Sequence, residues 1–451
     1  MRESPMRQKT FRPYDQHSLL LMPPSLHDWV DPAGLPAFIN DLVDELDRAP
    51  FLAAHDEPRG MPPYHPAMML KVLLYGYATG VRSSRRIEDR LRYDVGFMFL
   101  AGQARPDHKT IGEFRRRHLA AFSALFLDIL RLCQQAGLVK LGRVALDGTK
   151  IKANASKHKA MSYGRMPERE AALAAKVAAI LAEAEATDAA EDAEFGDARG
   201  DELPPELRTH AGRLAKIREA KAALEAEAKA RTGDPDAVPD PRGQRNFTDP
   251  ESRMMRSRPD GWVQGYNAGA VVDDTAQVIV ATLVTADPTD TRSLPALVAQ
   301  VRANTGRSPR RLLADAAYGS EDNLAALADA GIDAYVALAR DHHGREAPAA
   351  PRGRIPASLS TRGRMSRKLR TKRGRAHYAR RKAIVEPVFG QIKEARGFRR
   401  FSLRGLEAVQ AEWMLVTAVH NLGKLFTSGR AGRVLPGWTP TGRRATGWAT
   451  G

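Results

Sequence analysis

The stretch RVALDGTKIKANASKHK, residues 143–159, decides how the rest of the chain is interpreted. Its apolar residues 144–146 predict a short strand that delivers Asp147 into a Gly-Thr turn, with a lysine-rich loop directly after it. A carboxylate at a strand end can hold Mg²⁺, because this ion takes one or two carboxylates and keeps positions open for substrate phosphates. The alternative is that Asp147 only caps the turn, which is a common position for Asp before Gly.

The composition indicates a basic globular protein with a polyanionic partner. The 451 residues suffice for two or three domains, and the net charge of +17 favours nucleic acid or an anionic membrane surface as partner. No apolar run approaches the roughly 20 residues of a membrane span, and residues 1–16 lack the apolar core of a signal peptide. We therefore expect nucleic acid in the cytoplasm as the partner, and no membrane. The single cysteine, Cys133, excludes an intrachain disulfide and a cysteine-based zinc site.

The order of helical and strand signals predicts three regions and a mixed α/β fold. Residues 1–138 begin as an extended arm and continue as helices, which we interpret as an all-α DNA-binding domain. Residues 139–427 alternate strands and helices, and a helical hairpin over 165–232 interrupts this pattern. Residues 428–451 are rich in Gly, Thr and Arg and predict a disordered basic tail.

Within the mixed region, apolar runs bounded by turn signals predict the remaining elements. The predicted strands lie at 263–272, at 277–284, from 310 to Asp315, and at 334–339, and the predicted helices at 291–305, 322–330, 376–396 and 404–426. Residues 233–261 and 340–375 are rich in proline, glycine and charged side chains, and we interpret both as loops.

Basic side chains cluster in the N-terminal helical region. Arg85 and Arg86 belong to one predicted helix, and Arg115 and Arg116 belong to the helix that the sequence PDHKT opens. Phosphate contacts by these arginines would suit a small DNA-binding domain, and a turn at Gly80 is compatible with a helix-turn-helix motif. The alternative is a solvated helix face without a ligand.

Two further carboxylates are candidates for the site of Asp147. Asp315 follows the apolar strand of RRLLADAAYGS, and small residues after both aspartates keep the space open. If the two strands are adjacent, both carboxylates project from the same sheet edge. A third acid, Glu386 in RRKAIVEPVFGQIK, shares one helix face with Lys382 and Lys393. Taken alone, this pair is explained more simply by a salt bridge between Glu386 and Lys382, which are four positions apart.

Pro387 adds a constraint, because proline disfavours helical geometry at the residue before it. Either a helix restarts at Pro387 with Glu386 near its N-terminus, or Glu386 lies at a kink; both geometries are compatible with a carboxylate aimed at a metal.

Other polar and aromatic residues receive structural interpretations. Asp273 and Asp274 are expected in a hairpin turn, and Asp290 is expected to cap the helix from residue 291, with a place near the site as its alternative. Trp262 and Trp413 are interpreted as core residues.

Several stretches, in the same order along the chain, resemble the DDE transposases of bacterial insertion sequences, in particular the IS1182-type group of the IS4/IS5-like superfamily. The N-terminal stretches are FRPYDQHSLLLMPPSL (11–26), HPAMMLKVLLYGYATGVRSSRRIE (65–88) and PDHKTIGEFRRRH (106–118). The catalytic ones are ALDGTKIKANAS (145–156), NFTDPESRMM (246–255), LLADAAYGS (312–320) and VEPVFGQIK (385–393).

The resemblance implies an RNase H-like catalytic fold in which Asp147, Asp315 and Glu386 form an acidic triad that binds two Mg²⁺ or Mn²⁺ ions. It implies the terminal inverted repeats of an insertion sequence as substrate, together with target DNA, and a homo-oligomer on DNA at the bacterial nucleoid. The chemistry would be two-metal phosphoryl transfer, which needs no nucleophilic side chain.

The superfamily also places Tyr, Arg and Lys at set spacings around the third acid. Lys393 fits this pattern, whereas Lys382 stands where Arg is expected and Ala379 where Tyr is expected, with Tyr378 one position early. Further cations beside the acids would contact the DNA backbone. These are Lys150, Lys152, Lys157 and Lys159 near Asp147, and Arg370 and Lys372 in the basic loop.

Two other functions are compatible with these residues. A captured, catalytically inactive copy would act only as a DNA-binding protein, and metal-dependent nicking of DNA ends would separate it from an active transposase. A general nuclease of the same fold would cleave without depending on one end sequence.

Overall fold

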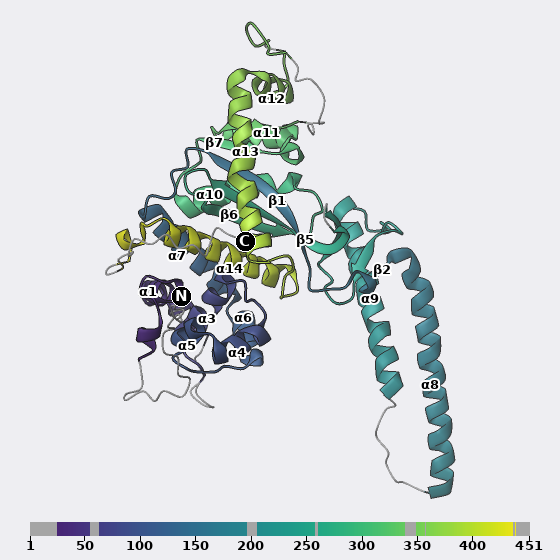
Figure 1. Cartoon of the computed structure of the whole chain (residues 1–451). Helices are drawn as coiled ribbons and strands as arrows, with labels where there is room; N and C mark the ends of the chain where they lie inside the picture. Colours follow the sequence, from purple (N-terminus) through teal and green to yellow (C-terminus); the bar gives the residue numbers. More distant parts are fainter. Residues whose placement is uncertain are drawn as a thin grey trace, which may run out of the picture.

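A mixed sheet lies at the centre of the molecule, with a helical N-terminal region on one side and a long helical hairpin projecting from the other (Figure 1). The computed structural model describes residues 25–54, 63–195, 205–257, 260–338, 349–356, 358–435 and 438. Within these ranges, none of the helices is long and apolar enough to span a membrane.

The central strand of the sheet is β1 (Val144–Lys152), which pairs antiparallel with β5 (Gly261–Asp273) and parallel with β7 (Arg311–Ala314). β8 (Asp333–Val336) pairs parallel with β7, and β4 (Arg253–Ser257) and β6 (Ile279–Thr285) pair antiparallel with different parts of β5. Helices connect the later strands: α10 (Leu294–Thr305) follows β6, and α11 (Glu321–Asp329) follows β7.

The strand that carries Asp147 is longer than predicted. Residues 147–152 continue β1, so the predicted Gly-Thr turn is wrong and Asp147 caps no turn; the predicted lysine-rich loop begins only after Lys152. The reason is tertiary, because β5 is 13 residues long and supplies a partner to every residue of β1. Lys150 and Lys152 are therefore strand residues.

Both segments interpreted as loops contain regular structure. Residues 233–261 include β3 (Gln244–Asn246) and β4, since the first half of β5 needs a neighbour beyond the end of β1. Residues 340–375 include α12 (Thr361–Arg370) and the start of α13 (Lys372–Gly390); the part 340–348 lies outside the described residues. Ser360 and Thr371 cap these two helices through their side-chain oxygens.

The projecting hairpin consists of α8 (Met166–Phe195) and α9 (Pro205–Thr232), and the small sheet of β2 (Ala160–Ser162) and β3 lies at its base. It has its own apolar core, in which Leu173 of α8 faces Leu214, Ile217 and Leu224 of α9. Glu170 pairs with Arg218 across the two helices. The two helices therefore hold each other independently of the main sheet.

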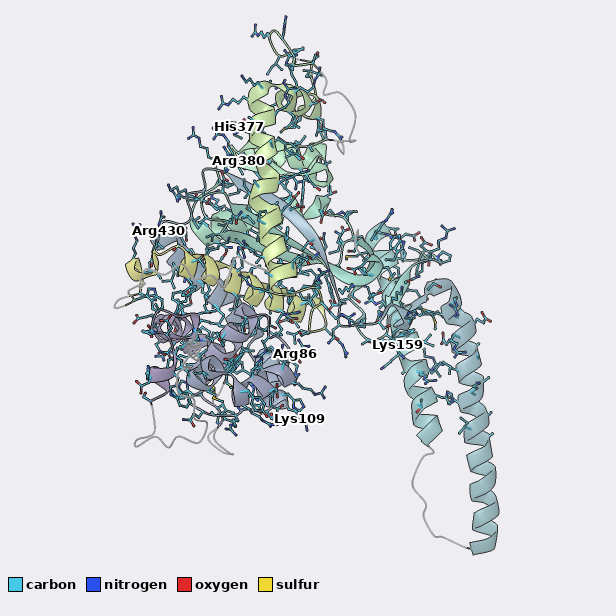
Figure 2. The ribbon with its side chains drawn as sticks, viewed as in Figure 1. Arg86, Lys109, Lys159, His377, Arg380 and Arg430 are labelled. Atoms are coloured by element: carbon cyan, nitrogen blue, oxygen red, sulfur yellow. The ribbon has the colours of Figure 1, made fainter. Side chains whose placement is uncertain are left out.

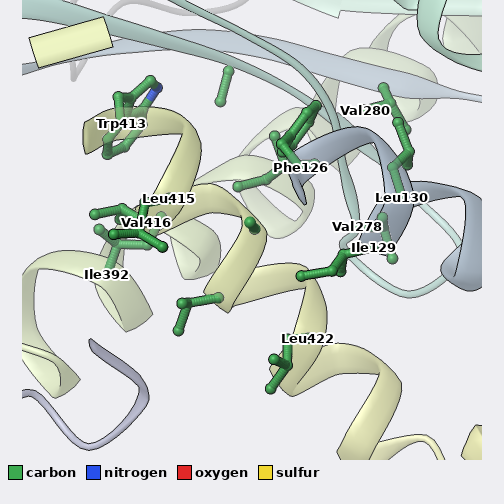
Figure 3. Close-up of a cluster of buried hydrophobic side chains, with 14 of the residues drawn as sticks. Phe126, Ile129, Leu130, Val278, Val280, Ile392, Trp413, Leu415, Val416 and Leu422 are labelled. Atoms are coloured by element: carbon green, nitrogen blue, oxygen red, sulfur yellow. The ribbon is translucent and has the colours of Figure 1, made fainter. Parts of the chain in front are cut away.

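The N-terminal region is entirely helical where it is described. Its helices are η1 (Leu26–Trp29), α1 (Leu35–Glu45), α2 (Ala49–Leu52), α3 (Pro66–Ala78), α4 (Ser84–Tyr93), α5 (Val95–Leu100), α6 (His108–Arg117) and α7 (Leu119–Gln135). One continuous hydrophobic core joins these helices to the sheet. Phe126, Ile129 and Leu130 of α7 lie against α14 (Leu406–Thr427), and Trp413 and Leu422 of α14 belong to the same cluster (Figure 3).

The motif NFTDPESRMM ties β5 to the start of α14. The buried Asp249 accepts a hydrogen bond from the Tyr266 hydroxyl and another from the Gly405 amide, and Glu251 accepts one from the Leu406 amide. The two carboxylates thus satisfy amides at the positive end of the α14 dipole.

The outer edge of β6 is closed by side-chain amides rather than by another strand. These amides come from α10 and α14, and each bonds a backbone group of the strand. The pairs are Asn421 with both backbone groups of Ile279, Asn304 with Val280, Gln300 with Thr282, and Gln410 with Val284.

The predicted disordered tail begins with ordered residues. The structure describes 428–435 and Trp438, and the rest of the segment lies outside the described residues. The indole ring of Trp438 packs edge-on against Phe38 and lies beside Phe426, which anchors this part of the chain to α1 and α14. This aromatic contact overrides the local Gly- and Arg-rich composition.

Candidate catalytic site

Asp147 and Asp315 lie side by side at one edge of the sheet. Leu146 of β1 is in parallel register with Ala314 of β7, so the next residue of each strand is an aspartate. Neighbouring strands are about 4.8 Å apart, which brings the two carboxylates close together. Asp315 begins the short turn η5 (Ala316–Tyr318), and its side chain accepts a hydrogen bond from the Ala317 amide.

The electrostatics of this pair favour an added cation. Burial raises the pKa of Asp147 to about 6; the Arg381 guanidinium opposes this shift, and the Asp315 carboxylate adds to it. Desolvation and a like charge both disfavour the ionised carboxylate. A positive group placed between the two oxygens would therefore be stabilised.

A cationic side chain already reaches this pocket from α13, which crosses β1, β5, β7 and β8. The Arg381 Nη1 donates to Asp147 Oδ2 at 2.9 Å, and Nη2 lies 3.9 Å from Glu386 Oε1. One guanidinium thus faces both acids, which places the two carboxylates within roughly 10 Å of each other. Arg381 follows Tyr378 by three positions, so this pair is displaced by one residue from the family spacing.

The carboxylates of Asp147 and Asp315 fit a divalent metal better than Glu386 does in this arrangement. Both aspartates are hard oxygen donors in a pocket that already accommodates a positive guanidinium. The Glu386 side chain is 54% exposed. Among the described residues, no group of three or more His, Cys, Asp or Glu is close enough to hold a metal ion. A three-acid site therefore requires Glu386 to approach the aspartates.

No helix restarts at Pro387, contrary to one of the two sequence alternatives, because α13 runs through it from Lys372 to Gly390 and contains Glu386. Proline cannot donate to the carbonyl four residues before it, and that acceptor, the Ala383 oxygen, takes a hydrogen bond from Gln277 Nε2 at 3.1 Å. The Ala383 carbonyl, which lacks its usual partner within the helix, thus links α13 to the turn between β5 and β6.

Lys393 points into the same edge of the sheet. It belongs to a π-helical turn, Gln391–Ala395, that continues α13. Its Nζ donates to Thr149 Oγ1 at 2.6 Å and to the Lys150 carbonyl at 3.0 Å, and burial lowers the pKa of its ammonium group. This ammonium group is held two residues beyond Asp147 along β1.

Asp290 lies near the site, which was the alternative to its predicted capping role. Its side chain makes no capping bond to the turn η4 (Thr291–Ser293), and it binds Lys150 Nζ at 3.3 Å and the Asn267 amide nitrogen instead. Gly148 permits this approach, because a Cβ there would lie 2.5 Å from Asp290 Oδ1. No local sequence signal identifies this contact, since the three side chains come from separate elements.

The candidate DNA contacts divide into exposed and paired side chains. The exposed ones are Lys157, Lys159, Arg85, Arg86, Arg116, Arg370 and Lys372. Lys150 and Lys152 are half-buried and paired with Asp290 and Asp260. Arg86 and Lys109 lie at the edge of the N-terminal helices, and Lys159 lies near the base of the hairpin (Figure 2).

Arg115 is not available for DNA, contrary to the prediction. It is 6% exposed, and its guanidinium donates to the Tyr77 hydroxyl, the Arg82 carbonyl and the Ser84 hydroxyl. The periodicity of α6 contained this information, because Arg115 shares the inward stripe of Ile111 and Phe114.

The two tryptophans interpreted as core residues differ. Trp413 is fully buried, and its indole nitrogen donates to the Gly269 carbonyl. Trp262 is 61% exposed, so its core interpretation is wrong; it lies near the start of β5, where the strand extends past the end of β1.

Comparisons with known families match two parts of the chain to transposase domains. The model described as "Transposase DDE domain" matches residues 239–422, which include Asp315 and Glu386, and the model described as "Transposase domain (DUF772)" matches residues 24–117. Asp147 lies outside both matched ranges. No curated protein and no solved structure gives a significant match.

Proposed function

Because the chain belongs to the DDE transposases, with IS1182-type organisation, we propose that it cleaves DNA at the terminal inverted repeats of an insertion sequence and joins the freed ends to target DNA. The observation that carries this proposal is the pair Asp147 and Asp315 on adjacent parallel strands, with Arg381 of α13 between Asp147 and Glu386. The mixed sheet, in which β5 runs against its neighbours, supports an RNase H-like core.

In this proposal, Asp147 and Asp315 hold Mg²⁺ or Mn²⁺, and Glu386 completes a site for two ions when it approaches. When bound, such ions lower the pKa of water and stabilise the leaving 3′-oxygen. The chain itself positions the DNA. Lys393 is held beside β1 to receive a terminal phosphate.

Binding relies on the exposed cations. Arg85, Arg86 and Arg116 on the N-terminal helices, with Lys157 and Lys159 beyond β1, contact the backbone of the transposon end, and Arg370 and Lys372 contact target DNA. We assign DNA recognition to residues 1–138 and catalysis to 139–427, with the protein working as a homo-oligomer at the bacterial nucleoid.

The test is cleavage of a duplex that carries the inverted repeat flanking the gene, with Mg²⁺ or Mn²⁺ present. We expect Asp147→Asn, Asp315→Asn and Glu386→Gln each to lower cleavage by about 10³-fold, because each removes several kcal/mol of metal-borne stabilisation, while DNA binding persists. Asp322→Asn, an exposed acid of α11, is the control and should cleave normally.

Each alternative outcome has a distinct meaning. Full cleavage by one of the three variants would remove that acid from the site. Tight binding of the repeat without metal-dependent cleavage by the wild type would favour an inactive, DNA-binding copy. Equal cleavage of a scrambled end would indicate a general nuclease.

A further inference from the structure

We propose that Arg381 is an exchangeable counter-ion: it occupies the Asp147 carboxylate in the free protein and transfers to a DNA phosphate on binding, so that DNA raises the affinity for the divalent metal. The inference rests on the proposed function and adds to it an order of events. The metal would load fully only after a DNA end is in place.

The first observation is where Arg381 binds. Its Nη1 donates to Asp147 Oδ2 at 2.9 Å, and the two side chains are 11% and 20% exposed. An oxygen that accepts from a guanidinium is a poorer metal ligand, and the guanidinium charge repels an incoming cation at this distance. Metal binding to the free protein therefore has to displace Arg381.

The second observation is that the guanidinium is incompletely satisfied. Its Nη2 lies 3.9 Å from Glu386 Oε1, beyond hydrogen-bond distance, and its buried Nε has no hydrogen-bond partner within the described residues. This Nε can donate to a ligand oxygen without giving up a hydrogen bond to the protein. A phosphate offers two oxygens in the geometry of the guanidinium fork, which Asp147 does not provide here.

Nearby cations are engaged differently. Lys393 donates to both Thr149 and the Lys150 carbonyl, and Lys150 itself pairs with Asp290. Among these cations near the two aspartates, Arg381 is the one that bonds Asp147 directly and keeps a buried N–H group unused. It is therefore the cation whose departure frees a proposed metal ligand.

The fold does not depend on Arg381 to place α13. Val385 and Val388 anchor the helix in the core, and the Ala383 carbonyl is held by Gln277. Replacement of Arg381 by glutamine should therefore leave the helix in position. By linkage, if DNA raises the metal affinity by some factor, the metal raises the DNA affinity by the same factor.

The experiment measures Mn²⁺ affinity directly, by calorimetry on the full chain, with and without a duplex carrying the inverted repeat and with the duplex alone as blank. We expect free Arg381→Gln to bind Mn²⁺ about tenfold more tightly than free wild type, within the range of typical couplings. The duplex should raise the affinity of the wild type by a similar factor and that of Arg381→Gln hardly at all. Arg380→Gln is the matched control, because Arg380 is an exposed neighbour that pairs with Asp274, and it should behave as the wild type does.

Two results would overturn the inference: a free Arg381→Gln that binds Mn²⁺ no more tightly than wild type, or a wild type whose Mn²⁺ affinity does not respond to DNA. The second comparison needs no variant, so it decides the matter even if Arg381→Gln does not fold. Asp147→Asn separates this inference from the proposed function. If it abolishes Mn²⁺ binding while Arg381→Gln has no effect, the counter-ion role fails and the metal site stands; if it binds Mn²⁺ as wild type does, both fail.

Discussion

Replacing two adjacent arginines of α6 by alanine should change two different properties: Arg115→Ala the stability of the fold, and Arg116→Ala the binding of DNA. The reason is that Arg115 is 6% exposed, whereas Arg116 is exposed. Arg115 bonds Tyr77, the Arg82 carbonyl and Ser84, and the Tyr77 hydroxyl in turn donates to the buried Glu412. Arg115→Ala therefore removes three hydrogen bonds and weakens the compensation of a buried carboxylate. At about 1 kcal/mol for each bond, we expect the free energy of unfolding to fall by about 3 kcal/mol.

Arg116→Ala should change the free energy of unfolding by less than about 0.5 kcal/mol, as is usual for an exposed side chain. If Arg116 contacts one phosphate, its loss reduces the slope of log Kobs against log salt by about 0.9. Arg115→Ala, studied where it is folded, should leave that slope unchanged.

Urea denaturation followed by circular dichroism measures the first effect, and fluorescence anisotropy of a labelled duplex over a series of salt concentrations measures the second. Equal unfolding free energies for the two variants would refute the structural role of Arg115. A reduced salt slope for Arg115→Ala would show that this side chain does reach DNA.

Two further predictions concern the pocket. Because the folded pKa of Asp147, about 6, exceeds its ordinary 3.8, its contribution to stability is fully present below about pH 4 and is lost as pH rises through 6. Relative to Asp147→Asn, the wild type should therefore lose about 1 kcal/mol of unfolding free energy between about pH 5 and pH 8; parallel pH curves from urea denaturation would contradict this. Gly148→Ala should cost about 1–3 kcal/mol in the same assay, since its Cβ would displace the Asp290 carboxylate, whereas at Gly142 a Cβ meets nothing within 4 Å and alanine should be neutral. Equal stability of the two alanine variants would show that Asp290 moves aside freely.

Periodicity in the sequence was sufficient to predict the helices that pack through one regular apolar face. The apolar stripe Leu214, Ile217 and Leu224 predicts the hairpin helix whose buried side it forms. The prediction ended β1 too early, because Gly148 and Thr149 indicate a turn when only near neighbours are considered. Pairing with β5 decides that segment, and β5 lies more than a hundred residues away in the chain.

At the candidate site, too, some residues were predictable from their neighbours in the sequence, and others only from the folded structure. Apolar runs followed by small residues indicated that Asp147 and Asp315 could share one sheet edge, and the pairing of β1 with β7 places them there. Asp290 approaches Gly148 only through the folded sheet, and Arg381 reaches Asp147 from a helix that crosses the strands. Helical spacing around Glu386 pointed to Lys382 instead, which is exposed. The way in which α13 lies across the sheet determines that Arg381 contacts Asp147. The spacing of residues along α13 does not contain this information.

The carboxamides along β6 also limit how copies of this protein can associate. A bare strand edge is a template on which another chain can add a strand and start an aggregate. Side-chain amides bond backbone groups along this edge of β6, so these groups are not available to pair with a strand of another chain. The amides belong to Asn421, Asn304, Gln300 and Gln410. We therefore expect that copies crowded on one DNA molecule do not associate by adding a strand along β6, whatever other surfaces they use.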